Sequence, residues 1–184
     1  MFFSFNSIIF SPFFVSHNFQ HDGIVYDNKK ISDWAPIGVE RFETLTRESF
    51  WDGCRFFRVI ENFVVQFGIN GNPSVQKEWR AKPLKDEKVK ASNQRGIVTY
   101  GTSGKDTRST QLFINTGENK FLDSQGFSPI GKVVAGMDVV DKIYNGYGDG
   151  KDKPKQNKIV NIGNEYLEKE FPKMSYIKKA TFIK

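Results

Sequence analysis

The feature that most restricts the fold of this chain is a series of short apolar runs separated by glycine and asparagine. Gly68, Gly101 and Gly117 are among the residues that separate them. The seven runs cover residues 54–60, 63–67, 96–100, 111–116, 130–134, 159–162 and 176–183. Runs of this length, bounded by turn-forming residues, predict β-strands. Many short strands in one chain favour an all-β barrel or sandwich.

Two segments have helical rather than strand spacing. Pro36 precedes apolar residues that recur three or four positions apart, which predicts a helix over 36–50. A second, shorter helix is predicted over 137–144, and both helices are expected to cap the ends of the β-structure. Residues 74–93 and 145–158 are polar, show no clear period and predict long exposed loops.

The length of 184 residues suits one domain, which we expect over residues 21–184. Residues 1–20 contain no charged residue and seven of the 18 phenylalanines. A signal peptide, a buried N-terminal strand and a misjudged gene start all remain open for this segment. Because a signal peptide is one of these alternatives, the expected location is either the cytoplasm or the secretory pathway. No run of 18 or more apolar residues occurs, and we therefore expect no membrane span.

The composition excludes several kinds of active site. Cys54 is the single cysteine, and His17 and His21 are the two histidines. A zinc site or a Ser-His-Asp triad therefore lacks its residues, and the expected site has no metal and no cofactor. The net charge of +6 is concentrated in residues 77–95 and 151–158. Neither run carries a nucleic-acid-binding motif in which aromatic and basic residues alternate, so solvated lysine-rich loops are favoured over nucleic-acid binding.

Polar side chains interrupt the apolar runs at a few positions. Arg58 and Gln66 lie inside strand-like segments, and Gln66 shares a strand face with Val64 because the two are two residues apart. Gln111 and Phe113 repeat this pairing of polar and apolar residues. Half-buried polar groups need either partners or a ligand. The pattern thus predicts either an apolar pocket with a few oriented polar groups or an internal arginine network.

Two longer segments resemble the signature sequences of the cyclophilins, the peptidyl-prolyl cis-trans isomerases. They are FFRVIENFVVQFGINGNP and RGIVTYGTSGKDTRSTQLFINTGENKFLDSQGFSPIGKVVAGMDVVDKIY, and the resemblance covers roughly residues 34–145. The tail is similar to that of larger, bacterial-like cyclophilins. The resemblance implies a mainly β fold, a closed eight-stranded antiparallel barrel capped by two helices. It also implies a monomeric isomerase that accelerates X-Pro isomerisation in peptides and in unfolded or flexible protein segments.

The resemblance further assigns roles to individual residues. It places the catalytic arginine on Arg58. The substrate-binding positions fall on Phe63, Val64, Gln66, Gly101, Thr102, Ser103, Gln111, Phe113, Phe121, Leu122 and Phe127. Cyclosporin-sensitive members carry tryptophan and histidine where this chain has Phe121 and Phe127, so we expect at most weak cyclosporin binding.

Some positions depart from the family pattern and leave alternatives open. Members often have Ala-Asn-Ala at residues 101–103 and methionine at Val64, which places the substrate preference of this chain in question. The usual first hairpin has only residues 21–26 and 29–31 as counterparts. One alternative is therefore a module that binds Pro-containing segments with weak or no turnover. A nucleic-acid-binding β-barrel, supported by the basic loops alone, is the other.

Overall fold

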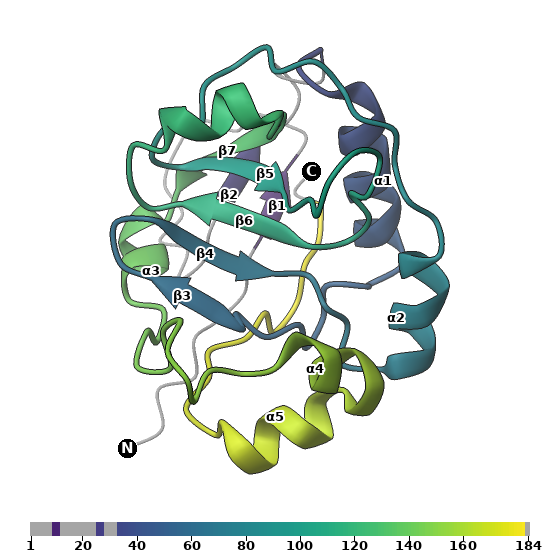
Figure 1. Ribbon diagram of the computed structural model, residues 1–184, viewed down its shortest axis with the longest axis vertical. Coiled ribbons are helices and arrows are strands. Elements are labelled where there is room, and N and C mark those ends of the chain that lie inside the picture. The colour runs from purple at the N-terminus through teal and green to yellow at the C-terminus, as the bar shows by residue number, and fades with distance from the viewer. Residues whose placement is uncertain (1–8, 12–24, 28–32, 183–184) are drawn as a thin grey trace.

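The computed structural model describes residues 9–11, 25–27 and 33–182 (Figure 1). The predicted N-terminal segment 1–20 lies largely outside the described residues. The elements, in chain order, are β1 (Ile9–Ser11), β2 (Val25–Asp27), α1 (Pro36–Arg47), β3 (Arg58–Ile60), β4 (Val64–Phe67), α2 (Pro73–Arg80), β5 (Ile97–Tyr100), β6 (Leu112–Asn115), the 3-10 helix η1 (Lys120–Gln125), β7 (Pro129–Ala135), α3 (Met137–Asp141), α4 (Gln156–Ile162) and α5 (Asn164–Glu170). Within the described part of the chain, none of the helices has the length and apolar character needed to cross a membrane.

The strands form one sheet in the order β1-β2-β7-β5-β6-β4-β3. All neighbouring strands are antiparallel except β1 and β2. A mainly antiparallel β-structure is therefore confirmed. The predicted eight-stranded closed barrel is not, because the described ladders join seven strands and none of them connects β3 to β1. The predicted first hairpin falls on residues 21–31, of which the structure describes only Val25–Asp27.

The two faces of the central strands have different neighbours. Val65, Phe67, Leu112 and Ile114 point to the main core, together with residues of α1 such as Phe42. Trp51 is completely buried in this core, with its ring centroid 5.4 Å from that of Phe42 and 5.8 Å from that of Phe67. The residues between them, which include Gln66 and Phe113, point to the opposite face, as the two-residue period of a strand requires.

Both predicted helices are present and shorter than expected. Helix α1 ends at Arg47, two residues before Ser49 adopts a left-handed backbone with φ 55°. Gly38 lets α1 approach β7 closely, because a Cβ atom there would lie 2.8 Å from Ile130 Cγ2. Helix α3 ends at Asp141, and α1 and α3 lie at opposite ends of the strands (Figure 1).

Three predicted segments differ from the structure. Residues 74–93 are not all loop, since α2 begins there with Pro73 and with the Asn72 side chain accepting from the Ser74 amide at 2.9 Å. The predicted strand 159–162 is wrong, because these residues belong to α4. A short apolar run fits a buried helix as well as a strand. The predicted strand 176–183 is not a continuous strand over its described residues 176–182, where Tyr176 pairs with Arg55 in an isolated bridge and Phe182 is a second bridge position.

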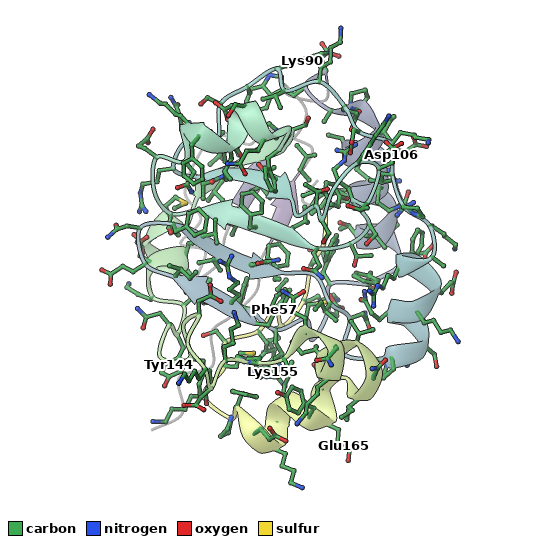
Figure 2. The ribbon with its side chains drawn as sticks, viewed as in Figure 1. Phe57, Lys90, Asp106, Tyr144, Lys155 and Glu165 are labelled. Carbon is green, nitrogen blue, oxygen red and sulfur yellow. The ribbon has the colours of Figure 1, made fainter. Side chains whose placement is uncertain are left out.

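A second apolar cluster forms beneath α4 and α5, beside the edge strand β3. Its buried members are Phe57, Ile69, Ile159, Tyr166, Leu167, Phe171 and Met174. Figure 2 shows Phe57 between the sheet and these helices, whereas Glu165 points outward. The cluster attaches the C-terminal part of the chain to the strand that carries Arg58.

Candidate active site

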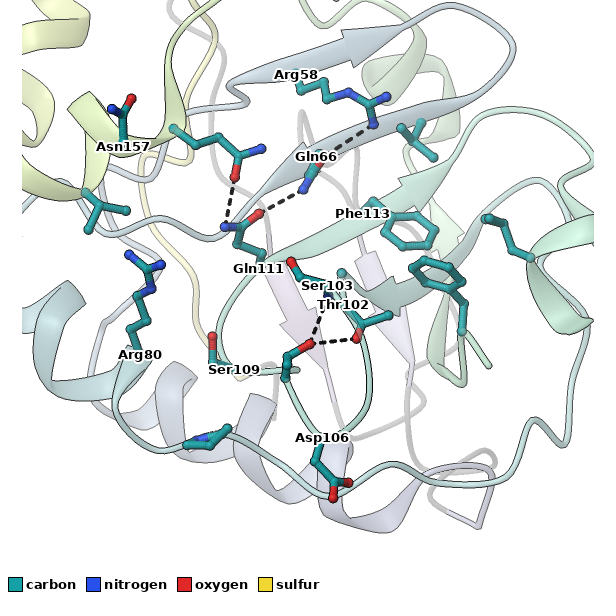
Figure 3. Close-up of a pocket in the computed structure, with 18 of the residues that line it drawn as sticks. Arg58, Gln66, Arg80, Thr102, Ser103, Asp106, Ser109, Gln111, Phe113 and Asn157 are labelled. Carbon is teal, nitrogen blue, oxygen red and sulfur yellow. Dashed lines mark hydrogen bonds between the residues drawn. The ribbon is translucent and has the colours of Figure 1, made fainter. Parts of the chain in front are cut away.

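Three polar side chains form a row across neighbouring strands. Arg58 faces Gln66 in the β3–β4 register, and its Nη1 donates to Gln66 Oε1 at 3.4 Å. Gln66 Nε2 in turn donates to Gln111 Oε1 at 2.9 Å (Figure 3). A guanidinium can only donate, so it turns the Gln66 oxygen toward itself and leaves the Gln66 amide nitrogen for Gln111. The arginine thus determines which atom donates and which accepts in each hydrogen bond of the row.

An apolar depression lies beside this row. Val64, Phe113 and Leu122 are its buried members, with the half-buried Phe63 and Phe127 packed against them. The Phe113 and Phe127 rings meet edge to face, with their centroids 5.8 Å apart. The Arg58 guanidinium carbon lies 5.6 Å from the Phe63 ring centroid, which places a cation next to the apolar surface. A small apolar group bound there would contact the guanidinium at one side.

The row and the depression belong to one cavity of about 700 Å³. All the predicted site residues except Phe121 line it: Arg58, Phe63, Val64, Gln66, Gly101, Thr102, Ser103, Gln111, Phe113, Leu122 and Phe127. Phe121 lies at the rim, where it is 54% exposed and stacks on Phe63 at 6.0 Å. The structure therefore brings the predicted residues together on the face of the sheet opposite the main core, and it does not bury Arg58 in an internal network.

The wall opposite Arg58 is a turn held by its own hydroxyl groups. The Ser103 amide donates to Thr107 Oγ1 at 2.9 Å, and the Thr102 and Thr107 hydroxyls lie 2.9 Å apart. The Gly101 amide donates to the Gln111 carbonyl at 2.9 Å, which joins the turn to β6. These hydrogen bonds hold the turn in place relative to the polar row.

A buried amide network supports the depression from beneath. Asn119 Nδ2 donates to the Phe63 carbonyl at 2.8 Å and to Asn115 Oδ1 at 2.7 Å. Asn93 Nδ2 donates to the Phe127 carbonyl at 2.9 Å. The backbone of both half-buried phenylalanines is thereby fixed. Sequence reasoning missed this network because Asn93 was assigned to an exposed loop.

Two further residues reach the row and were not predicted. Asp149 Oδ2 accepts from Arg58 Nη2 at 3.1 Å, and Asp149 Oδ1 accepts from Lys153 Nζ at 2.5 Å. The hydrogen bonds from Arg58 and then Lys153 hold the pKa of the Asp149 carboxyl below its usual value. At the other end, Gln111 Nε2 donates to Gln156 Oε1 at 3.2 Å. Both residues come from a segment whose sequence indicated only a solvated loop.

The candidate chemistry uses hydrogen bonding and apolar contact. In the described part of the chain, no cluster of three or more His, Cys, Asp or Glu side chains is placed to hold a metal ion. Cys54 is fully buried in the main core, and this burial raises the pKa of its thiol, which keeps it protonated. The cavity therefore offers a fixed guanidinium beside an apolar pocket, which suits the binding of a peptide segment with a small apolar ring.

A mainly antiparallel sheet with a half-apolar, half-polar cavity on its outer face defines the class: a β protein whose site has the shape and chemistry for a peptide segment. Residues 31–164 match the family model described as "Cyclophilin type peptidyl-prolyl cis-trans isomerase/CLD". The chain belongs to this family, and the resemblance found in its signature segments is confirmed.

Curated relatives and solved structures agree with this assignment. A peptidyl-prolyl cis-trans isomerase of Acinetobacter baylyi is 37% identical over 149 residues, covering 75% of this chain and 76% of the relative. Peptidyl-prolyl cis-trans isomerase B of Escherichia coli is 34% identical over 160 residues, covering 79% and 95%. A cyclophilin-type isomerase of Cryptosporidium parvum, solved in the presence of the dipeptide Ala-Pro, superposes with a TM-score of 0.52 at 20% identity, covering 67% of this chain and 80% of that one. A cyclophilin of Hirschia baltica gives a TM-score of 0.52 at 16% identity, covering 61% of each chain, and both structures show the same fold.

Proposed function

We propose that this chain catalyses the cis–trans isomerisation of X-Pro peptide bonds with Arg58 as its catalytic residue. The observation that carries the proposal is the position of the guanidinium, 5.6 Å from the Phe63 ring and at the edge of the apolar depression. Proline-containing peptides and unfolded or flexible protein segments are the proposed substrates. The Cryptosporidium structure solved with Ala-Pro supports this substrate class.

The chemistry follows from the resonance of the amide bond. The barrier to rotation is about 18–20 kcal/mol, because the planar amide loses resonance as it twists. In the twisted state the prolyl nitrogen becomes pyramidal and gains a lone pair that can accept a hydrogen bond. A fixed donor at that nitrogen stabilises the transition state more than the ground state, which is the condition for catalysis. Arginine suits this role better than lysine because its planar fork keeps its direction.

The other cavity residues have proposed roles that follow from their contacts. Val64, Phe113 and Leu122 would hold the proline ring, because they form the apolar depression. Gln66 would orient Arg58 through the bond to Nη1. The turn of residues 101–103 would contact the residues before proline from the opposite wall. No proton transfer, metal or cofactor enters this mechanism.

The finer features of fold and assembly are part of the same proposal. We infer that the chain completes a closed eight-stranded barrel and acts as a monomer. The likeness to the two cyclophilin structures supports the barrel. Phe121 at the rim, in place of a tryptophan, supports weak cyclosporin binding at most.

Two-dimensional NMR exchange on a short Xaa-Pro peptide tests the proposed activity without a coupled protease. Cross-peaks between the cis and trans forms should build up faster when the protein is added at catalytic concentration. Shift changes in the protein should fall on residues that line the cavity, such as Gln111 and Phe113. Shift changes without faster exchange would reject catalysis and favour the module that only binds Pro-containing segments.

A further inference from the structure

The loop between α3 and α4, residues 142–155, reaches the site described above, and with the first residue of α4 it holds both ends of the polar row. Asp149 contacts Arg58 at one end, and Gln156, at the start of α4, contacts Gln111 at the other. The hydrogen bonds thus run from Asp149 through Arg58, Gln66 and Gln111 to Gln156 without a break. Both ends of the row depend on one short stretch of chain.

The α3–α4 loop is itself fixed to the C-terminal cluster. The Tyr147 ring packs edge to face against Phe171, with the centroids 5.0 Å apart, and its hydroxyl accepts from the Lys173 amide at 3.2 Å. The Lys155 amide donates to the Tyr166 hydroxyl at 3.2 Å. These contacts lie on both sides of Asp149 in the sequence. They give the carboxylate a defined place beside β3.

The two bonds to Arg58 restrict its guanidinium from opposite sides. Nη1 donates to Gln66 on the neighbouring strand, whereas Nη2 donates to Asp149 beyond the edge of the sheet. A planar fork that is held at both terminal nitrogens has one orientation, and each nitrogen keeps a second N–H for a substrate. Lys153 binds the other Asp149 oxygen, so the three side chains together retain one positive charge. The carboxylate therefore orients the arginine without cancelling its field.

We propose that Asp149 is a positioning residue: its carboxylate holds the second nitrogen of the Arg58 guanidinium, so that the α3–α4 loop fixes the direction of the catalytic group. The inference rests on the proposed function, because it assigns Asp149 to the reaction of Arg58. It differs from a merely structural role in that the effect of Asp149 on the rate passes through Arg58 alone.

A double-mutant cycle measures this dependence. Asp149→Ala should lower kcat by about three- to fivefold, the effect of an ion pair of intermediate exposure, while peptide Kd stays nearly unchanged. Asp149→Asn should lose less, because its amide oxygen can still accept from Nη2. In an Arg58→Ala background, assayed at higher protein concentration, Asp149→Ala should cause no further loss.

Asp152→Asn is the matched control, because Asp152 is an exposed carboxylate of the same loop and lies outside the hydrogen bonds and ion pairs of the described residues. It should exchange peptide like the wild type. An unchanged or higher kcat in Asp149→Ala would overturn the inference, and so would an equal loss with and without Arg58. If the wild type did not accelerate exchange over that of the free peptide, the proposed function itself would fail, and this outcome is distinct from the other two. Thermal unfolding of each variant confirms that folded proteins are compared.

Discussion

Replacing Arg58 with alanine should remove most of the isomerase turnover and leave the fold nearly intact. The side chain is only 27% exposed, yet its contacts in the free protein are weak ones. They are a 3.4 Å bond to Gln66, an ion pair with the 37%-exposed Asp149, and a ring contact with Phe63 at 5.6 Å. Together they are worth about 1–2 kcal/mol, against about 5–15 kcal/mol for the stability of a typical domain.

The loss in rate should be larger than the loss in stability. One charge-assisted hydrogen bond, made fully in the transition state, contributes about 1.5–3 kcal/mol. Since about 1.4 kcal/mol corresponds to a factor of ten, kcat/KM should fall by about 10- to 100-fold. Arg58→Lys should recover little, because a flexible ammonium cannot keep the direction of the fork. Peptide binding should change less than the rate, because the apolar depression remains.

The assay is NMR exchange on an Xaa-Pro peptide at equal concentrations of folded protein. Arg55→Ala is a suitable control, since Arg55 also forms an ion pair, with Glu168 at 2.8 Å, and lies over the Tyr176 ring at 4.2 Å. Arg55 is not among the residues that line the cavity, so its loss should reduce stability without reducing exchange. Equal exchange by the wild type and Arg58→Ala would refute the proposed mechanism.

Three further predictions concern the row, the core and pH. Gln66→Leu should lower kcat by about two- to tenfold in the same exchange assay, because it removes the long hydrogen bond from Arg58 Nη1 that orients the guanidinium. Trp51→Ala should lower the free energy of unfolding by about 3–5 kcal/mol in urea denaturation, since the indole is completely buried and donates to Thr46 Oγ1 at 3.0 Å. Because the folded-state pKa of Asp149 is lowered by Arg58 and Lys153, its contribution to stability should be constant between about pH 7 and 5 and be lost as the pH falls below the usual Asp value of about 3.9. Urea denaturation of the wild type and Asp149→Asn across this range should therefore differ by a constant amount until the acid limb, where the difference shrinks.

The part of the site that lies on strands could be predicted because strand geometry is local. The two-residue alternation places Val64 and Gln66 on one face, and the same alternation places Gln111 and Phe113 together. The choice between an open pocket and an internal arginine network could not be made from alternation. It needed either the resemblance to the cyclophilins or the strand register, in which Gln66 pairs with both Arg58 and Phe113.

The part that could not be predicted depends on contacts between distant segments. Asp149 lies 91 residues after Arg58, in a lysine-rich stretch whose composition is that of a solvated loop. The apolar run 159–162 carries no local signal that separates a strand from a buried helix, and the choice was made by packing of Ile159 against α5 and Phe57. Helix α2 differs, since Asn72 followed by Pro73 is a recognisable helix start, and the loop predicted over residues 74–93 overlooks it.

The position of β3 at the edge of the described sheet explains why the C-terminal region matters to the site. An edge strand has a neighbour on one side only, and β3 has β4. On its other side, Phe57 packs into the cluster beneath α4 and α5, while the next residue, Arg58, turns to the cavity. The same cluster holds Tyr147 and thereby the loop that carries Asp149. The C-terminal helices thus fix both the strand that bears the guanidinium and the carboxylate that orients it.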